Sequence, residues 1–169
     1  MLTKELITEL KNKGNGDLGY LVEKQHDIGS ISFILENLGF LPKNFNGSFL
    51  IDLLKHEHHQ VRLLAVKNIG KLSNENYLGH LSQMIDNETN TSVKREVVSA
   101  IGRMRNPKNK EILYKILQDE DPKIVCQAIR ALLVFDKDKE VEEQLKPLVN
   151  HPNEMVRTVI YKEFFADQE

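Results

Sequence analysis

Residues 121–132 read Asp-Pro-Lys-Ile-Val-Cys-Gln-Ala-Ile-Arg-Ala-Leu, and this stretch decides the fold because its pattern recurs along the chain. In each copy, apolar side chains fall at the first, fifth and ninth positions, which is the stripe of a buried helix and not the two-residue alternation of a strand. The four copies are spaced by 32, 31 and 32 residues, at 61–70, 93–102, 124–133 and 156–165. Each copy is predicted to be a helix.

A shorter apolar-periodic stretch precedes each copy and supplies the partner of a helix pair. These stretches are residues 49–54, 77–85, 112–117 and 141–149. The segments between partner and copy are polar and contain Asp, Asn, Ser or Pro, residues that cap or start helices. Extending the period backwards predicts a weaker pair at 17–24 and 30–39, preceded by an extra helix over 1–12.

One helix pair of this size cannot bury its apolar face alone, whereas a stack of pairs makes a continuous core. The sequence therefore predicts an all-α fold, an α-solenoid of four to five helix pairs. We expect one domain over residues 1–169, and the sequence leaves open that it is the N-terminal part of a longer protein. The expected units are a capping helix over 1–16 and repeats at about 17–40, 48–72, 76–105, 109–135 and 139–166.

The pattern of residues 121–132, with the endings Ile69-Gly70 and Ile101-Gly102, resembles HEAT repeats, particularly the phycobilin-lyase type. The resemblance covers about residues 17 to 165. It implies that the position after the first Val serves polar ladders between repeats, and this position holds Arg62, Lys94 and Arg157. HEAT-like arrays serve as scaffolds, adaptors, nucleic-acid binders and occasionally enzymes, so the function is argued separately from the fold.

Composition bounds the class of protein. No apolar run approaches the roughly 18 residues of a membrane span, and residues 1–10 do not form a signal peptide, so we expect a cytoplasmic protein with no membrane partner. The single Cys126 can form neither an intrachain disulfide nor a thiolate zinc site. The net charge is −2, but residues 56–115 carry 10 basic and 6 acidic side chains. This local excess leaves a basic face open.

Two motifs have the letters of a functional site. Residues 14–19 match a dinucleotide-binding loop, but no strand precedes them, so Gly14 is predicted to end a helix. His56 and His59 lie in the densest group of metal-ligand types, yet the His-Glu pair occurs once, so we expect a solvated turn. No cofactor, metal site or catalytic residue is predicted.

The basic side chains form the candidate binding site. The seventh residue of each copy is Lys67, Ser99, Arg130 or Lys162, and other basic residues share their helix face. Stacking would align them into a ladder on the concave face. The predicted set is Lys67, Lys71, Arg95, Arg103, Arg105, Arg130 and Lys162, with Lys108 at the rim. The alternative is that these side chains only solvate an exposed face.

The sequence favours a non-catalytic recognition module that holds DNA or an acidic protein on the concave face. Residues 95–105, 130–135 and 150–155 look similar to HEAT segments ahead of the catalytic domain in bacterial restriction-modification DNA methyltransferases, which implies an accessory domain. The alternatives are a free-standing protein-protein adaptor and a HEAT-like lyase or hydroxylase. Because the last copy is rich in apolar residues, we expect exposed apolar surface at Val159, Phe164 or Phe165, covered by a catalytic domain or another partner.

Overall fold

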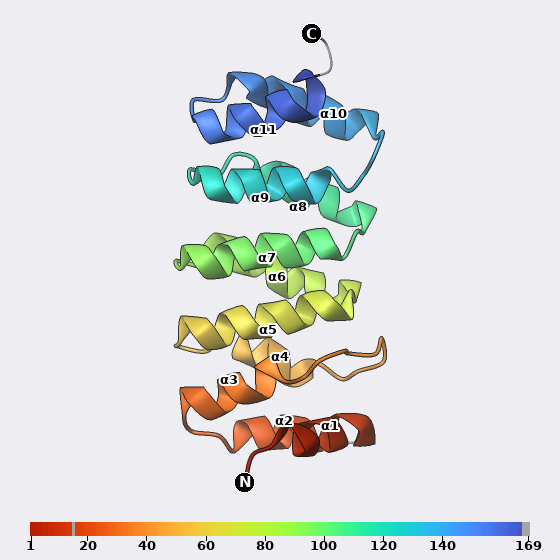
Figure 1. Cartoon of the computed structure of the whole chain (residues 1–169), viewed down its shortest axis with the longest axis vertical. Coiled ribbons are helices and arrows are strands. Elements are labelled where there is room, and N and C mark those ends of the chain that lie inside the picture. Colours follow the sequence, from red (N-terminus) through yellow and green to blue (C-terminus); the bar gives the residue numbers. More distant parts are fainter. Residues whose placement is uncertain (15, 167–169) are drawn as a thin grey trace.

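The computed structural model describes residues 1–14 and 16–166, and all regular elements in this part of the chain are helices. They stack along the long axis of the molecule, with the two termini at opposite ends (Figure 1). The second helices of the pairs are α3, Ile28–Glu36, α5, His59–Leu72, α7, Thr91–Arg103, α9, Pro122–Leu132, and α11, Glu154–Phe164. The first helices are α2, Asp17–Glu23, α4, Ser48–Leu53, α6, Leu78–Asn87, α8, Lys110–Ile116, and α10, Lys139–Leu145, and α1, Lys4–Lys13, precedes them. The predicted α-solenoid is confirmed.

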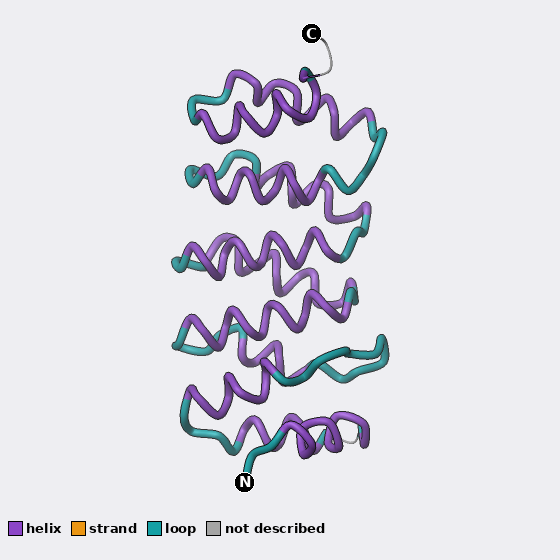
Figure 2. Tube along the Cα trace, in the orientation of Figure 1, coloured by secondary structure: helices purple, strands orange, loops and turns teal. Residues whose placement is uncertain are grey.

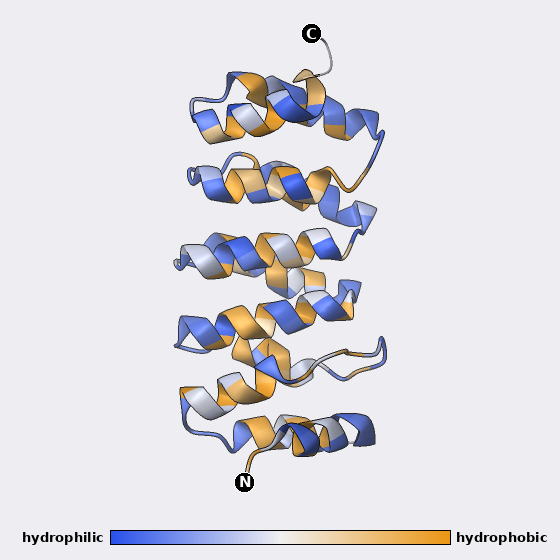
Figure 3. Cartoon of the chain, in the orientation of Figure 1, coloured by the Kyte–Doolittle hydropathy of each residue, from blue (hydrophilic) through white to orange (hydrophobic). Residues whose placement is uncertain are grey.

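The stack has two layers. Helices α5, α7, α9 and α11 form the nearer layer in Figure 1, and α4, α6, α8 and α10 lie behind it. Most connections are short, but residues 37–47 form a longer loop between α3 and α4 (Figure 2). Apolar and polar residues alternate around each helix, as expected for helices with one buried face (Figure 3).

The first helices differ most from the sequence prediction. The helix predicted over 141–149 ends at Leu145 and continues as a 3₁₀ turn, Lys146–Asn150. Pro147 explains this break, because proline has no amide hydrogen and its ring clashes with the preceding helical turn. Similar 3₁₀ turns, Glu75–Tyr77 and Pro107–Asn109, lead into α6 and α8.

Each second helix begins with a side chain that accepts a hydrogen bond from a main-chain N–H of its first turn. This cap satisfies one of the amide groups that a helix start leaves without a partner. The capping residues are Asp27, His58, Asn90, Asp121 and Asn153. His58 differs from the other four, because it accepts through a ring nitrogen and not an oxygen: its Nδ1 accepts from the Gln60 N–H at 3.3 Å.

The core follows the predicted stripe. The fifth residue of each copy, namely Ala65, Val97, Ala128 or Ile160, is fully buried. The first and ninth residues are buried too, except Phe164, which is partly buried. Each fully buried aliphatic side chain of Val, Leu or Ile size contributes about 1.5–3 kcal/mol relative to an exposed one.

Two glycines set the spacing of the central second helices. A Cβ atom on Gly102 would lie 2.7 Å from the Cβ of Ala131, and one on Gly70 would lie 3.0 Å from the Cβ of Ala100. Both distances are too short for ordinary carbon contacts, so these positions admit only glycine at the present spacing. The predicted Ile-Gly endings therefore mark the closest approach between α5, α7 and α9.

Ion pairs join consecutive helix pairs along one edge of the stack. Arg62 of α5 pairs with Glu88, which lies in the turn between α6 and α7, through Nε and Oε2 at 2.8 Å. Lys94 of α7 pairs with Asp119, in the turn between α8 and α9, at 2.6 Å. The Glu88 side chain is only 4% exposed. Arg62 and Lys94 thus form the polar ladder that the resemblance to HEAT repeats implied, whereas Arg157 forms no ion pair with a described residue.

Candidate partner-binding surface

The predicted basic residues are all exposed, and six of the seven lie on the second helices. The exception is Arg105, which follows the end of α7 and has a positive φ of 47°. We call the exposed side of the second helices the second-helix face. Within residues 1–14 and 16–166, Arg103 is the one member of this set of seven that takes part in an ion pair.

Four positive charges gather around α5, three of them on this face and one on α1. Burial lowers the pKa of Lys71 from its ordinary value, and three neighbouring positive charges lower it further. Those charges belong to Arg103, Lys11 and Lys67. We call Lys11, Lys67, Lys71 and Arg103 the basic cluster. The structure thus brings together three of the predicted residues with one, Lys11, that the sequence did not indicate.

Main-chain carbonyls hold two of these lysines in place. Nζ of Lys11 donates to the carbonyl oxygens of Leu38 and Phe40 at 2.8 and 2.9 Å. Nζ of Lys71 donates to the carbonyl oxygen of Gly39 at 3.3 Å and to Oδ1 of Asn68 at 3.1 Å. The side chain of Phe40 is 81% exposed. The loop after α3 therefore anchors two ammonium groups and carries an exposed aromatic residue, whose main-chain carbonyl binds one of them.

Carboxylates interrupt the row of cations. Nη2 of Arg103 pairs with Oε1 of Glu96 at 2.7 Å, and Nη1 donates to Oγ of Ser99 at 2.9 Å. Lys108, predicted at the rim, pairs with Glu75 at 3.1 Å. The face is therefore a cluster with separate further cations and not an unbroken ladder.

The C-terminal helix exposes apolar side chains beyond the three that the sequence indicated. Val159, Phe164 and Phe165 are all partly buried against the core. The exposed apolar side chains of α11 are Met155 and Tyr161, at 47% and 43%. The rings of Tyr161 and Phe165 stack with centroids 6.4 Å apart, which covers part of Phe165.

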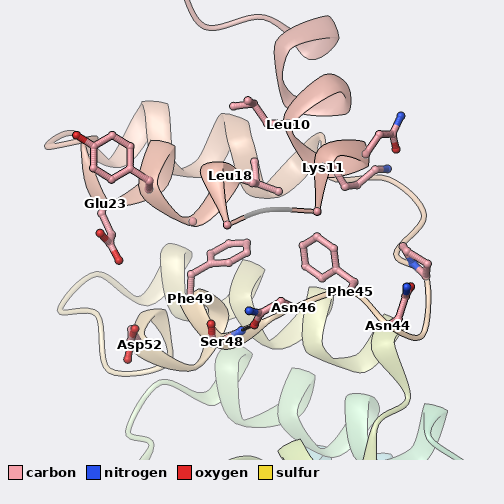
Figure 4. Close-up of a pocket in the computed structure, with 16 residues that line it drawn as sticks. Leu10, Lys11, Leu18, Glu23, Asn44, Phe45, Asn46, Ser48, Phe49 and Asp52 are labelled. Atoms are coloured by element: carbon pink, nitrogen blue, oxygen red, sulfur yellow. Dashed lines mark hydrogen bonds between the residues drawn. The ribbon is translucent and has the colours of Figure 1, made fainter.

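An open cleft of about 510 Å³ lies between the α1–α2 region and α4 (Figure 4). The rings of Phe45 and Phe49 face it in an edge-to-face arrangement with centroids 6.1 Å apart. Gly14 borders the cleft and ends α1 with a left-handed φ of 65°, so the predicted helix stop is confirmed. The described lining contains no His or Cys side chain, and its carboxylates are Glu23 and Asp52.

The histidine cluster forms part of a turn. Nδ1 of His56 accepts a hydrogen bond from the main-chain N–H of His58 at 3.0 Å, and the rings of His58 and His59 stack at 4.9 Å. Within the described residues, no three His, Cys, Asp or Glu side chains converge on one point. Cys126 is buried, and this burial raises the pKa of its thiol.

Stacked helix pairs with a shared core and a polar ladder define an α-solenoid. A family model described as HEAT repeats matches residues 47–133, more than half of the chain, and the chain therefore belongs to the HEAT repeat family. The chain is similar to the crystal structure of an engineered protein from the Northeast Structural Genomics Consortium, with a TM-score of 0.55 and 14% identity over 95% of this chain and 82% of that one. At this identity the likeness concerns the fold alone.

Among curated proteins, none matches the chain. None of the helices in the described ranges has the length and hydropathy needed to cross a bilayer. The family and the fold make the chain a helical repeat scaffold. What it binds must be inferred from the chemistry of its surface.

Proposed function

We propose that this HEAT-repeat chain is a non-catalytic recognition module whose second-helix face binds an acidic segment of a partner protein. The basic cluster carries the proposal. Lys11 and Lys71 are already held by main-chain carbonyls, so they lose little side-chain freedom when an anion arrives. Lys67 adds a charge that no carboxylate among the described residues neutralises.

The exposed ring of Phe40 adds an apolar contact beside this charge. A large exposed aromatic side chain is a common anchor in protein interfaces, because it buries much surface and loses few rotamers. An acidic segment with an apolar residue fits both features. Arg130 of α9 and Lys162 of α11 extend the positive surface along the stack for a longer partner.

The interrupted charge pattern favours a protein over DNA. A duplex presents regularly spaced phosphates, and Glu96 and Glu75 would meet them among the cations. An acidic protein can place neutral or basic side chains opposite these carboxylates. If DNA were bound through about four charges, the logarithm of its affinity would fall with that of salt at a slope near −3.6.

The test uses a fluorescein-labelled oligo-glutamate peptide with one central Phe, measured by fluorescence anisotropy at low salt. The double variant Lys67→Glu and Arg130→Glu should weaken binding about tenfold, or ~0.7 kcal/mol per reversed charge. The matched control, Lys115→Glu and Lys139→Glu, changes the net charge equally on the first helices α8 and α10. Equal weakening by both double variants would contradict the proposal, and tighter binding of labelled duplex DNA would replace the acidic protein by nucleic acid.

A finer proposal names the partner as the catalytic part of a bacterial DNA methyltransferase. It is supported only by the similarity of residues 95–105, 130–135 and 150–155 to HEAT segments of such enzymes. The test is whether the natural gene continues into, or lies beside, a methyltransferase gene. A gene neighbourhood without one would remove this finer proposal and leave the recognition module in place.

A further inference from the structure

Arg157, in the first turn of α11, repeats the main-chain hydrogen bonds of Arg62 in α5. Nη1 of Arg62 donates to the carbonyl oxygens six and five residues before it, at 2.8 and 2.9 Å. Nη1 of Arg157 donates to the carbonyl oxygens at the same two relative positions, at 2.8 and 2.7 Å. The turns before α5 and α11 therefore hold the guanidinium groups of Arg62 and Arg157 in the same way.

The two arginines differ in what the rest of the guanidinium binds. Nε and Nη2 of Arg62 donate to the two carboxylate oxygens of Glu88 at 2.8 and 2.9 Å, a bidentate pair across to the next helix pair. Among the described residues, no carboxylate pairs with Arg157. Arg157 thus presents the same donors at the C-terminal end of the stack.

The side chains at the four internal junctions between helix pairs follow one rule. In the inter-helix turn at each junction, one side chain accepts the main-chain N–H two residues later. At two junctions the second position of the preceding copy forms an ion pair with that side chain, and at the other two only the residue types are compared. Where the second position is a cation, the turn residue is an acid, and where it is apolar, the turn residue is a histidine. The pairs are Ile31 with His56, Arg62 with Glu88, Lys94 with Asp119, and Val125 with His151. By this rule, we expect Arg157 to pair with an Asp or Glu side chain in the inter-helix turn of a following unit.

The apolar part of the junction is repeated as well. The second, sixth and tenth positions of a copy share one helix face, because they are four residues apart. At the sixth position, Val66, Val98 and Ile129 are fully buried. Tyr161 occupies this position in α11 and is 43% exposed. A terminal repeat that ends a stack carries polar residues on its outer face, whereas this one keeps a large aromatic ring there.

The tenth position indicates how closely a following unit would approach. Gly70 and Gly102 occupy it at the closely packed junctions, and Leu133 occupies it in α9. Helices α9 and α11 share fewer contacts than α5 and α7. Phe165 occupies this position in α11, so a following unit would pack at the wider spacing.

We infer that Arg157, Tyr161 and Phe165, which we call the terminal face, form a docking surface for a helix pair of a second protein. That helix pair carries an Asp or Glu in its inter-helix turn, because the bidentate donors of Arg157 match a carboxylate. The terminal face and the basic cluster share no residue, so this inference does not rest on the proposed function. The continuity of the terminal face with the internal junctions defines the occupant as a unit of HEAT type.

The test attaches a helix pair of known sequence to the full chain, since fusion raises the effective concentration of a weak partner. The probe is a copy of residues 75–105 attached directly after Glu169, so that the copied Glu88 follows Arg157 by 26 residues, as Glu88 follows Arg62. We expect Arg157→Ala to lower the melting temperature of the fused chain by about 4 °C more than that of the unfused chain. Glu→Gln at the copied Glu88 should have a similar effect, and the two changes should not add.

The matched control is Lys162→Ala, which removes another exposed cation of α11 and should lower both melting temperatures equally. Equal effects of Arg157→Ala on the fused and unfused chains would show that this arginine serves only its own turn, and would overturn the inference. An attached unit that stays as protease-sensitive as an unfolded chain would also overturn it. Dimerisation of the unfused protein that Arg157→Ala abolishes would make a second copy the occupant in place of a different protein.

Discussion

The two ends of the stack are built differently. At the N-terminal end, α1 buries Ile7 completely and exposes polar side chains such as Thr8 and Glu9. At the C-terminal end, α11 exposes Met155 and Tyr161. A polar outer face is expected of a capping helix, whereas α11 repeats the pattern of an internal junction. The outermost helix therefore exposes polar side chains at one end, which we call the closed end, and keeps exposed apolar side chains at the other, which we call the open end.

The largest expected effect is at the closed end. Ile7→Ala removes a fully buried side chain and should lower the free energy of unfolding by about 3 kcal/mol, because a cavity remains in the first helix pair. Tyr161→Ala at the open end should cost less than about 1 kcal/mol in the isolated chain. Urea denaturation measures the free energy of unfolding of both variants. Equal losses of stability in the two variants would contradict the difference between the two ends.

The second effect compares the two arginines. Arg62→Ala should cost about 2 kcal/mol more than Arg157→Ala, because it leaves the Glu88 carboxylate buried without its counter-ion. Both changes remove the same pair of main-chain hydrogen bonds, so each serves as the control of the other. Similar costs in denaturant titrations would mean that the ion pair adds nothing to the internal junction.

A glycine substitution tests the close spacing of the internal junctions. Gly102→Ala should destabilise the fold by about 1.5 kcal/mol, because its Cβ would lie 2.7 Å from the Cβ of Ala131. Gly79→Ala is the matched control, since a Cβ there meets nothing within 4 Å, and it should stabilise α6 by about 0.5 kcal/mol. Thermal unfolding of the two variants should shift in opposite directions, and shifts of the same sign would refute the packing argument.

The smallest effect is the pH dependence of the Arg62–Glu88 junction. Burial of Glu88 acts to raise its pKa, but hydrogen bonds from Arg62 and from the Asn90 N–H outweigh it, so the pKa lies below the ordinary value of 4.5. Its stabilising contribution is therefore complete above the pKa of the unfolded chain and is lost as the pH falls through the folded pKa. Glu88→Gln should cost about 1 kcal/mol at neutral pH and nothing in acid below the folded pKa. A cost that does not change with pH would contradict this assignment.

The sequence predicted the fold because its main determinant is local. Apolar residues at the first, fifth and ninth positions define a helix face without reference to the rest of the chain, as Val97 and Ile160 illustrate. The ends of the first helices were less accurate, because Pro147 breaks α10 inside an otherwise apolar-periodic stretch.

The candidate surface was predictable only in part. Regular spacing in sequence placed Lys67 and Arg130 on one kind of helix face. It did not indicate Lys11, because this lysine reaches the cluster through main-chain carbonyls of a loop 27 and 29 residues away, and carbonyls leave no sequence signal. Nor did it show that Glu96 neutralises Arg103, since this pair depends on the rotamers of two side chains that lie two turns apart on one helix face.

The most direct test of acidic-partner binding by the second-helix face is a map of the binding surface at residue resolution. NMR chemical-shift changes should be recorded while the oligo-glutamate peptide with one Phe is added to the isotope-labelled chain. We expect the changes to concentrate on the second-helix face, around Lys67, Lys71 and the loop that carries Phe40. Changes concentrated on the first helices α6 and α8, or spread evenly over all lysines, would contradict it.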